Sequence, residues 1–185
     1  LEKHIESLQP QRRAFYHPWL VDPQTLRPAT GPSAEPDDSG AGALRLLDLT
    51  VVRLQKNATT SRYRQQVIRI VNPQGAELNR TFHIEYAPAR QQVRILQSRV
   101  FHPDNTTDAS VLVRDYSLSE PWYNLYYDVH EREITFPELA PGDLVELSYL
   151  IEDMGGRNML GNYFGDLTLL QYSQPTQKAV YVLLA

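Results

Sequence analysis

The stretch from Tyr126 to Glu152 limits the possible folds most, because it predicts two strands that turn back on each other. On both sides of its centre, apolar and polar residues alternate, which is typical of strands with one buried face. At the centre stands Ala140-Pro141-Gly142-Asp143. The proline supplies the fixed φ of the second position of a type II turn, and the glycine supplies the positive φ of the third. We therefore expect an antiparallel hairpin closed by this turn.

Further strand patterns follow one another at regular spacing. Residues 44–54 and 60–71 flank a short polar link, so they predict a second hairpin. A turn is expected at Asn72 to Gly75. The other strand candidates lie at 81–86, 92–101, 111–113, 163–172 and 178–184. Many short strands with almost no helix predict an all-β fold, an antiparallel β-sandwich.

The N-terminal part of the chain differs from this pattern. An apolar stripe at helical spacing, ended by Pro10, predicts a short N-terminal helix, and an extended segment follows it. A stretch rich in Pro, Gly and Ser then predicts a mobile connection. We therefore expect a helical and extended leader (1–27), a flexible linker (28–43) and a β-sandwich domain (44–185).

Charge and composition exclude several classes of function. The 18 basic residues are scattered among 22 acidic ones, and the net charge of -4 argues against a nucleic-acid partner. The chain contains no cysteine, which rules out disulfides, thiolate zinc sites and a cysteine nucleophile within it. No apolar run approaches the ~20 residues that a transmembrane helix needs.

Several motifs together resemble one family. They are Tyr86-Ala87-Pro88, the run from Arg99 to Asn105, the run from Phe136 to Glu146 around Pro-Gly-Asp, and Tyr163-Phe164-Gly165-Asp166. In these motifs the chain from about Leu44 to Ala185 resembles a bacterial domain of unknown function found immediately N-terminal to transglutaminase-like domains. Asn105 stands where that family usually has glycine, a mild departure because Asn also tolerates a positive φ.

The resemblance implies a β-sandwich without known catalytic residues, carried in multidomain bacterial proteins that are often exported or membrane-associated. In relatives the following transglutaminase-like domain carries a Cys-His-Asp triad, and some relatives have helical repeats upstream. We therefore expect a non-catalytic accessory module, without cofactor, that positions or regulates such a following domain through interdomain contacts.

Aromatic residues supply the candidate binding surface. The densest aromatic cluster in the chain contains Trp122, Tyr123, Tyr126 and Tyr127, and two further aromatics, Phe15 and Trp19, lie in the leader. Aromatic faces stack on sugars, grip peptides and form interface hot spots. A glycan- or peptide-binding module is therefore the alternative function. The competing interpretation is that the cluster caps a sandwich edge and that the leader aromatics cover the β core.

Neither metal binding nor acid-base catalysis is predicted from the titratable residues. His83 with Glu85, or His102 with Asp104, supplies only two ligands, and two ligands do not make a metal site. Strand alternation also places Asp128 and His130 on the face opposite to Glu131 and Glu133, which separates the groups that a proton relay would need.

Overall fold

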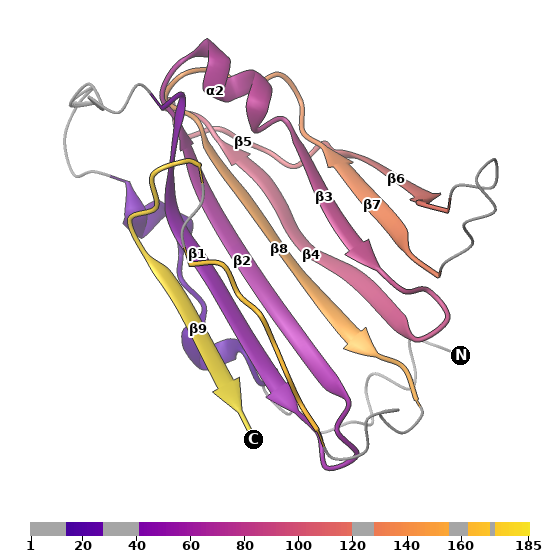
Figure 1. Cartoon of the computed structure of the whole chain (residues 1–185). Coiled ribbons are helices and arrows are strands. Elements are labelled where there is room, and N and C mark those ends of the chain that lie inside the picture. The colour runs from indigo at the N-terminus through magenta and orange to yellow at the C-terminus, as the bar shows by residue number, and fades with distance from the viewer. Residues whose placement is uncertain (1–13, 28–40, 120–127, 156–162, 171–172) are drawn as a thin grey trace, which may run out of the picture.

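The computed structural model describes residues 14–27, 41–119, 128–155, 163–170 and 173–185, and within them it contains two β-sheets (Figure 1). The large sheet has the order β5-β4-β8-β2-β1-β9, and the small sheet has the order β3-β7-β6. All neighbouring strands pair antiparallel except β1 and β9, which are parallel. The predicted all-β, sandwich-like fold is therefore confirmed.

The described elements have the following bounds. The large sheet contains β1 (Ala43–Leu54), β2 (Thr60–Ile70), β4 (Gln91–Phe101), β5 (Thr107–Asp108), β8 (Leu144–Asp153) and β9 (Ala179–Leu184). The small sheet contains β3 (Thr81–Tyr86), β6 (Leu112–Ser117) and β7 (His130–Thr135). The helices are two short 3₁₀ turns, η2 (His17–Trp19) and η3 (Pro23–Leu26), and the α-helix α2 (Pro73–Leu78).

Most strand predictions are confirmed. The β1–β2 hairpin forms as expected, and β3, β4 and β9 lie within a residue of their predicted bounds. The predicted strand at 163–172 is wrong over residues 163–170, which have no regular structure. The turn expected at Asn72 begins a helix instead, because the Asn72 side chain accepts a hydrogen bond of 3.0 Å from the Gly75 amide and caps α2.

The hairpin predicted between Tyr126 and Glu152 is wrong in its pairing. Its two arms correspond to β7 and β8, which belong to different sheets. The turn between them does form, because the Asp143 amide donates to the Ala140 carbonyl at 3.1 Å and Gly142 has φ +96°. The turn carries the chain from one sheet to the other, where β8 pairs with β2 and β4. Alternation identifies the faces of a strand but does not identify its neighbours.

Both faces of the large sheet are covered. The side that faces the small sheet, here called the inner face, packs Val145, Leu147 and Ile68 against Ile84 and Ile134 of the small sheet. The opposite side, the outer face, carries an apolar cluster from β1, β2, β4 and β8. Because β8 is covered on both sides, residues 144–150 are all buried rather than alternately exposed.

Residues 14–27, here called the strap, lie on the outer face and pass behind β1 in Figure 1. Phe15, Tyr16 and Trp19 pack against the apolar cluster there, which confirms that the leader aromatics cover the β core. The predicted N-terminal helix and most of the predicted linker lie outside the described residues.

The remaining half of the inner face, over β1 and β2, is crossed by residues 163–170 (Figure 1). Asp166 anchors this segment, since it forms an ion pair of 2.6 Å with Arg62 and accepts a hydrogen bond of 2.6 Å from Tyr181. Within the described ranges, no helix is both long enough and apolar enough to span a bilayer.

Candidate functional site

The six aromatic residues predicted to bind a ligand fall in two places. Trp122, Tyr123, Tyr126 and Tyr127 lie outside the described residues, so their binding role stays a prediction. Phe15 and Trp19 are half-buried in the strap, where they pack on the outer face. Other residues of the same strap, Tyr16 and Leu20 to Gln24, line a groove on that face.

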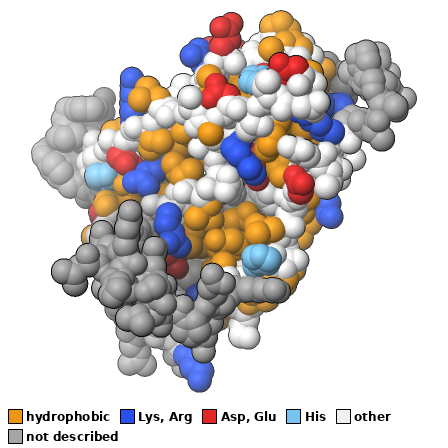
Figure 2. All heavy atoms as spheres, turned by 180° about the vertical axis from the view of Figure 1, so that it is seen from behind, with side chains coloured by type: hydrophobic (Ala, Val, Ile, Leu, Met, Phe, Trp, Pro, Cys, Tyr) orange, Lys and Arg blue, Asp and Glu red, His pale blue; other side chains and the backbone are white. Residues whose placement is uncertain are grey.

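A groove of about 780 Å³ lies between the strap and the outer face of the large sheet. The strap forms one wall through Leu20 to Gln24, and β4 forms the other wall through Gln97, Arg99 and Phe101. Figure 2, seen from the side opposite to Figure 1, shows hydrophobic side chains gathered over the middle of this face with Lys and Arg between them. The lining of the groove is mixed: apolar side chains such as Leu96 and Phe101 alternate with polar and charged ones such as Gln97 and Arg99.

The floor of the groove carries a chain of polar side chains that are almost completely buried. Glu146 and Gln65 are each only 2% exposed, and Arg99 reaches them from β4. Arg99 donates to Glu146 Oε2 from Nη2 at 2.6 Å and from Nε at 2.9 Å. Gln65 Nε2 donates to Glu146 Oε1 at 2.8 Å. The carboxylate thus holds both its neighbours in fixed orientations.

Gln65 uses its remaining hydrogen-bonding capacity on the backbone of the strap. Its Nε2 donates to the Val21 carbonyl at 2.8 Å, and its Oε1 accepts from the Val21 amide at 3.3 Å. A side-chain amide that bonds both groups of one residue imitates the pairing of a neighbouring strand. The arrangement can therefore recognise an extended peptide backbone.

Two tyrosines complete the floor beneath the strap. The rings of Tyr16 and Tyr63 are parallel within 7° and 4.0 Å apart, which places a strap ring directly on a sheet ring. Burial raises the pKa of Tyr63; a hydrogen bond with Ser148 opposes this effect, and the charge of Glu146 adds to it. Tyr63 therefore stays a neutral hydroxyl at physiological pH.

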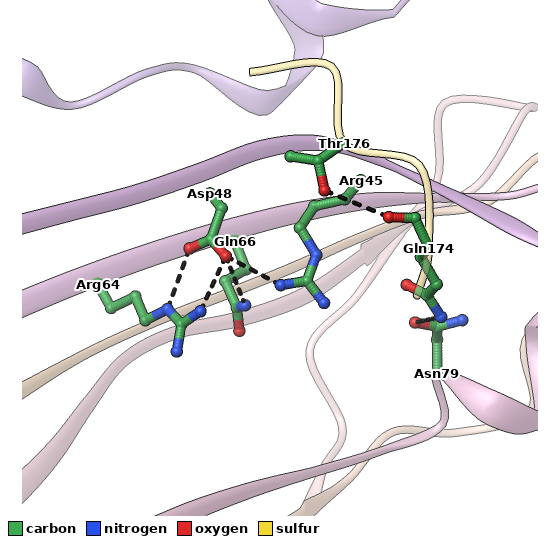
Figure 3. Close-up of polar contacts among 7 residues, drawn as sticks. All are labelled: Arg45, Asp48, Arg64, Gln66, Asn79, Gln174 and Thr176. Carbon is green, nitrogen blue, oxygen red and sulfur yellow. Dashed lines mark hydrogen bonds and ion pairs between the residues drawn. The ribbon is translucent and has the colours of Figure 1, made fainter. Parts of the chain in front are cut away.

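A second polar cluster lies on the inner face, between β1 and β2 (Figure 3). Arg64 clamps Asp48 through Nε at 3.0 Å and Nη2 at 2.8 Å, and Arg45 Nη1 adds a contact of 2.9 Å. The Gln66 amide oxygen faces the two arginines in its better orientation. It then accepts a hydrogen bond of 2.9 Å from Arg45 and one of 3.2 Å from Arg64, whereas in the other orientation the amide nitrogen makes a contact of only 3.5 Å with Asp48. Burial alone would raise the pKa of Asp48, but the hydrogen bonds and charges of the two arginines outweigh it and lower the pKa.

The segment that follows residue 172 closes the end of this second cluster. Gln174 donates to Asn79 Oδ1 at 3.1 Å (Figure 3), and the Arg45 amide donates to the Pro175 carbonyl at 2.9 Å. These contacts tie the approach to β9 to the end of α2 and the start of β1. The cluster therefore connects several elements of the fold, and the charge of its carboxylate is compensated by the two arginines.

The histidines considered for metal binding each pair with one carboxylate of another strand or loop. His83 Nδ1 lies 2.7 Å from Glu131, and His102 Nδ1 lies 2.9 Å from the fully buried Asp143. Glu131 also accepts a hydrogen bond from Tyr116. In the described ranges, no group of three or more His, Asp or Glu side chains could hold a metal ion.

Sequence reasoning missed the Arg99, Glu146 and Gln65 floor. The alternation in β8 assigned Glu146 and Ser148 to a solvent-facing side, whereas both lie buried beneath the outer face. The sequence signal that could have revealed this floor was the extended leader with its aromatic residues. An element that covers the second face of a sheet buries the polar side chains that strand alternation assigns to solvent.

The chain was compared with known families, curated proteins and solved structures. A family model for a domain of unknown function with a solved structure, DUF3857, matches residues 56–185. No curated protein matches. A crystal structure of a "putative protease" from Parabacteroides distasonis is similar with a TM-score of 0.55 and 16% identity, over 62% of this chain and 24% of that chain. This likeness supports the fold alone.

A second solved structure is less similar. It is the CBM3a-L domain of scaffoldin cipA from the Clostridium thermocellum cellulosome, with a TM-score of 0.34 and 12% identity, over 61% of this chain and 68% of that chain. Since the chain spans about a quarter of the Parabacteroides protein, that protein contains much besides this fold.

Proposed function

Because the chain belongs to the DUF3857 family of domains of unknown function, we propose that it is a non-catalytic accessory module of a larger protein. It positions or regulates a following transglutaminase-like domain through interdomain contacts. The choice of a transglutaminase-like partner rests on the family resemblance of the sequence motifs around Pro141 and Tyr163. The interdomain contact rests on an exposed apolar surface.

The observation that carries the proposal is an exposed row of leucines beside β9. Leu167 is 87% exposed, Leu169 63% and Leu170 58%, although neighbouring Asp166 is anchored to β2 and β9. Isolated exposed leucines are ordinary, but three exposed leucines within four residues of an anchored segment are typical of an interaction surface. Leu183 of β9, 46% exposed, lies on a strand bonded to the same anchor.

The comparison with the Parabacteroides protein supports the modular arrangement. There the similar region accounts for 24% of a much longer chain, so in that protein the fold is one part among others. A rigid two-sheet platform with a projecting apolar segment suits a module that acts by contact.

The proposal is tested in the full-length protein with Leu167→Asp and Leu169→Asp combined. We expect faster amide hydrogen exchange and faster proteolysis at the boundary with the following domain, while the melting temperature of residues 1–185 alone stays unchanged. The side chains already face solvent in the isolated chain, so the two new charges cost little there.

Leu78→Asp on α2 is the matched control, since this leucine is 66% exposed but belongs to a different surface. It should leave both measurements as in the wild type. If the double variant also leaves exchange and proteolysis at the boundary unchanged, residues 167–170 are not an interdomain contact.

A further inference from the structure

We propose that the outer face of the large sheet is a peptide-binding groove and that the strap is its resident peptide. The strap contacts the sheet as a bound peptide would, and it is exchangeable for a free peptide of the same chemistry. This goes beyond the accessory role, because it concerns the opposite face and a different contact.

The backbone of the strap supports this first. Every backbone–backbone hydrogen bond of residues 14–27 is internal, within η2, η3 and the turns beside them. Asp22 caps η3 by accepting from the Gln24 amide at 3.0 Å. An integral sheet element would share backbone bonds with a neighbouring strand, whereas the strap shapes itself and adds no strand to the sheet.

The contacts between the strap and the rest of the chain run through side chains. Gln65 bonds both backbone groups of Val21, and Tyr63 stacks under Tyr16. Arg27 Nη2 donates to the His102 carbonyl at 2.7 Å. Side chains that read a peptide backbone at one point and seat its aromatic and cationic residues at others are the contacts of a peptide-recognition surface.

The floor is organised without help from the strap. Arg99 and Glu146 pair within the sheet, and Glu146 orients Gln65. A buried ion pair adds little net stability compared with apolar side chains of similar size. Its position beneath Gln65 is better explained by aiming that amide at a peptide, which is the preorganisation that binding sites use.

The strap also leaves part of the hollow unfilled. Within residues 14–27 only Pro23 is buried, and a groove of about 780 Å³ remains beside the strap. The contacts define the ligand that fits: a peptide with an aromatic residue, a backbone unit five residues later, a proline two residues after that at the start of a 3₁₀ turn, and then an arginine. Loss of the strap would uncover the apolar cluster of the outer face, which favours replacement by such a peptide.

The experiment converts the strap from a tethered to a free ligand. A specific protease site is placed within residues 28–40 of the full chain, and Trp122→Phe leaves Trp19 as the single tryptophan reporter of the two in the chain. After cleavage, dilution should release the strap and change Trp19 fluorescence, because the millimolar effective concentration of a short tether is lost. A synthetic peptide of residues 14–27 should rebind one to one and restore the melting temperature.

The role of Gln65 is tested on the peptide, so that the protein stays intact. Replacing the amide of Val21 by an ester removes the N–H that Gln65 Oε1 accepts, and we expect about tenfold weaker binding. The matched control is a peptide with His17→Ala, whose exposed side chain lies outside the groove lining and makes no hydrogen bond among the described residues; it should bind as the unmodified peptide does.

Three results would overturn the proposal. The cleaved protein could unfold on dilution and not recover with saturating peptide, which would make the strap an integral core element. The cleaved strap could stay bound without exchange. The ester peptide could bind as tightly as the unmodified one, which would mean that Gln65 does not read the backbone.

Discussion

At the scale of single residues, the buried polar groups distinguish this sheet from a simple apolar sandwich. Glu146 and Asp48 are both carboxylates within strands, both are nearly inaccessible, and each is paired with arginine. They lie on opposite faces of the large sheet. The cost of burying each charge is offset by charge-assisted hydrogen bonds. Removing an arginine partner should therefore lower the free energy of unfolding more than the partial exposure of that arginine suggests.

Arg99→Ala tests the floor of the groove. Without Arg99, Gln65 is the one side chain in the described part of the structure that still bonds the buried Glu146. The Arg99 side chain is 35% exposed, so solvent screens the pair in part, and we expect the free energy of unfolding to fall by about 2 kcal/mol. Urea denaturation measures this change.

Arg94→Ala is the control on the same strand. Arg94 and Glu152 lie 3.6 Å apart with side chains 59% and 38% exposed, so the loss should stay within about 0.5 kcal/mol. Equal effects of the two substitutions would show that the Arg99 pair is not a buried constraint.

At the scale of elements, close backbone contact decides how α2 sits at the end of β1. A Cβ on Gly75 would lie 1.7 Å from the Gly42 carbonyl oxygen, and one on Gly42 would lie 2.4 Å from the Gly75 amide. The Val71 amide also donates to the Gly42 carbonyl at 2.9 Å. Two glycines distant in sequence therefore let the helix reach the strand, a requirement that no local pattern around either glycine reveals.

Gly75→Ala should lower the free energy of unfolding by about 3 kcal/mol, because the methyl group displaces α2 from β1. Helix propensity alone predicts the opposite sign, since alanine is the better helix former. Thermal and urea unfolding distinguish the two expectations.

Gly155→Ala provides the comparison. Gly155 has φ +63°, but a Cβ there would meet no atom within 4 Å, so only backbone strain of about 1 kcal/mol is expected. A smaller loss for Gly75→Ala than for Gly155→Ala would contradict the close approach of α2 and β1.

At the scale of the whole molecule, ionised carboxylates join strands within the large sheet and also join separate layers. Asp48 joins β1 to β2, Asp166 joins the segment 163–170 to β2 and β9, and Asp115 holds Arg132, whose Nη1 donates to the Val93 carbonyl of the large sheet at 2.8 Å. The hydrogen bond from Arg132 lowers the pKa of Asp115. Burial opposes the shift at Asp166, but hydrogen bonds from Arg62 and Tyr181 lower its pKa.

These shifts predict loss of stability in acid. Each folded pKa lies below the ordinary value of 3.8, so the unfolded chain binds protons more readily. The stabilisation is complete above the unfolded pKa and is lost as the pH falls through the folded pKa. Asp48→Asn should lower the free energy of unfolding by about 3 kcal/mol at pH 7, and its difference from the wild type should shrink below about pH 4.

Urea denaturation between pH 7 and pH 3 measures this profile. Glu138→Gln, at an exposed position without an ion pair among the described residues, should follow the wild type throughout. A difference between Asp48→Asn and the wild type that stays constant across this range would contradict the linkage.

The amino-acid sequence was sufficient to assign the strand segments, the all-β class, the turn at Pro141 and Gly142, and the family. Each of these rests on local information, namely the period of side chains along a strand, the φ that a residue permits, or a run of consecutive residues. The aromatics at 122–127, in contrast, remain a prediction of the sequence alone.

The neighbours of each strand and the burial of its polar side chains became clear in the folded structure alone. The expected hairpin separated into β7 and β8 of two sheets, because alternation does not specify a partner strand. Glu146 and Gln65 became a buried floor, because the strap covers a face that the strand pattern assigned to solvent. Pairing and burial depend on what lies across a face, and that is set by segments far away in the chain.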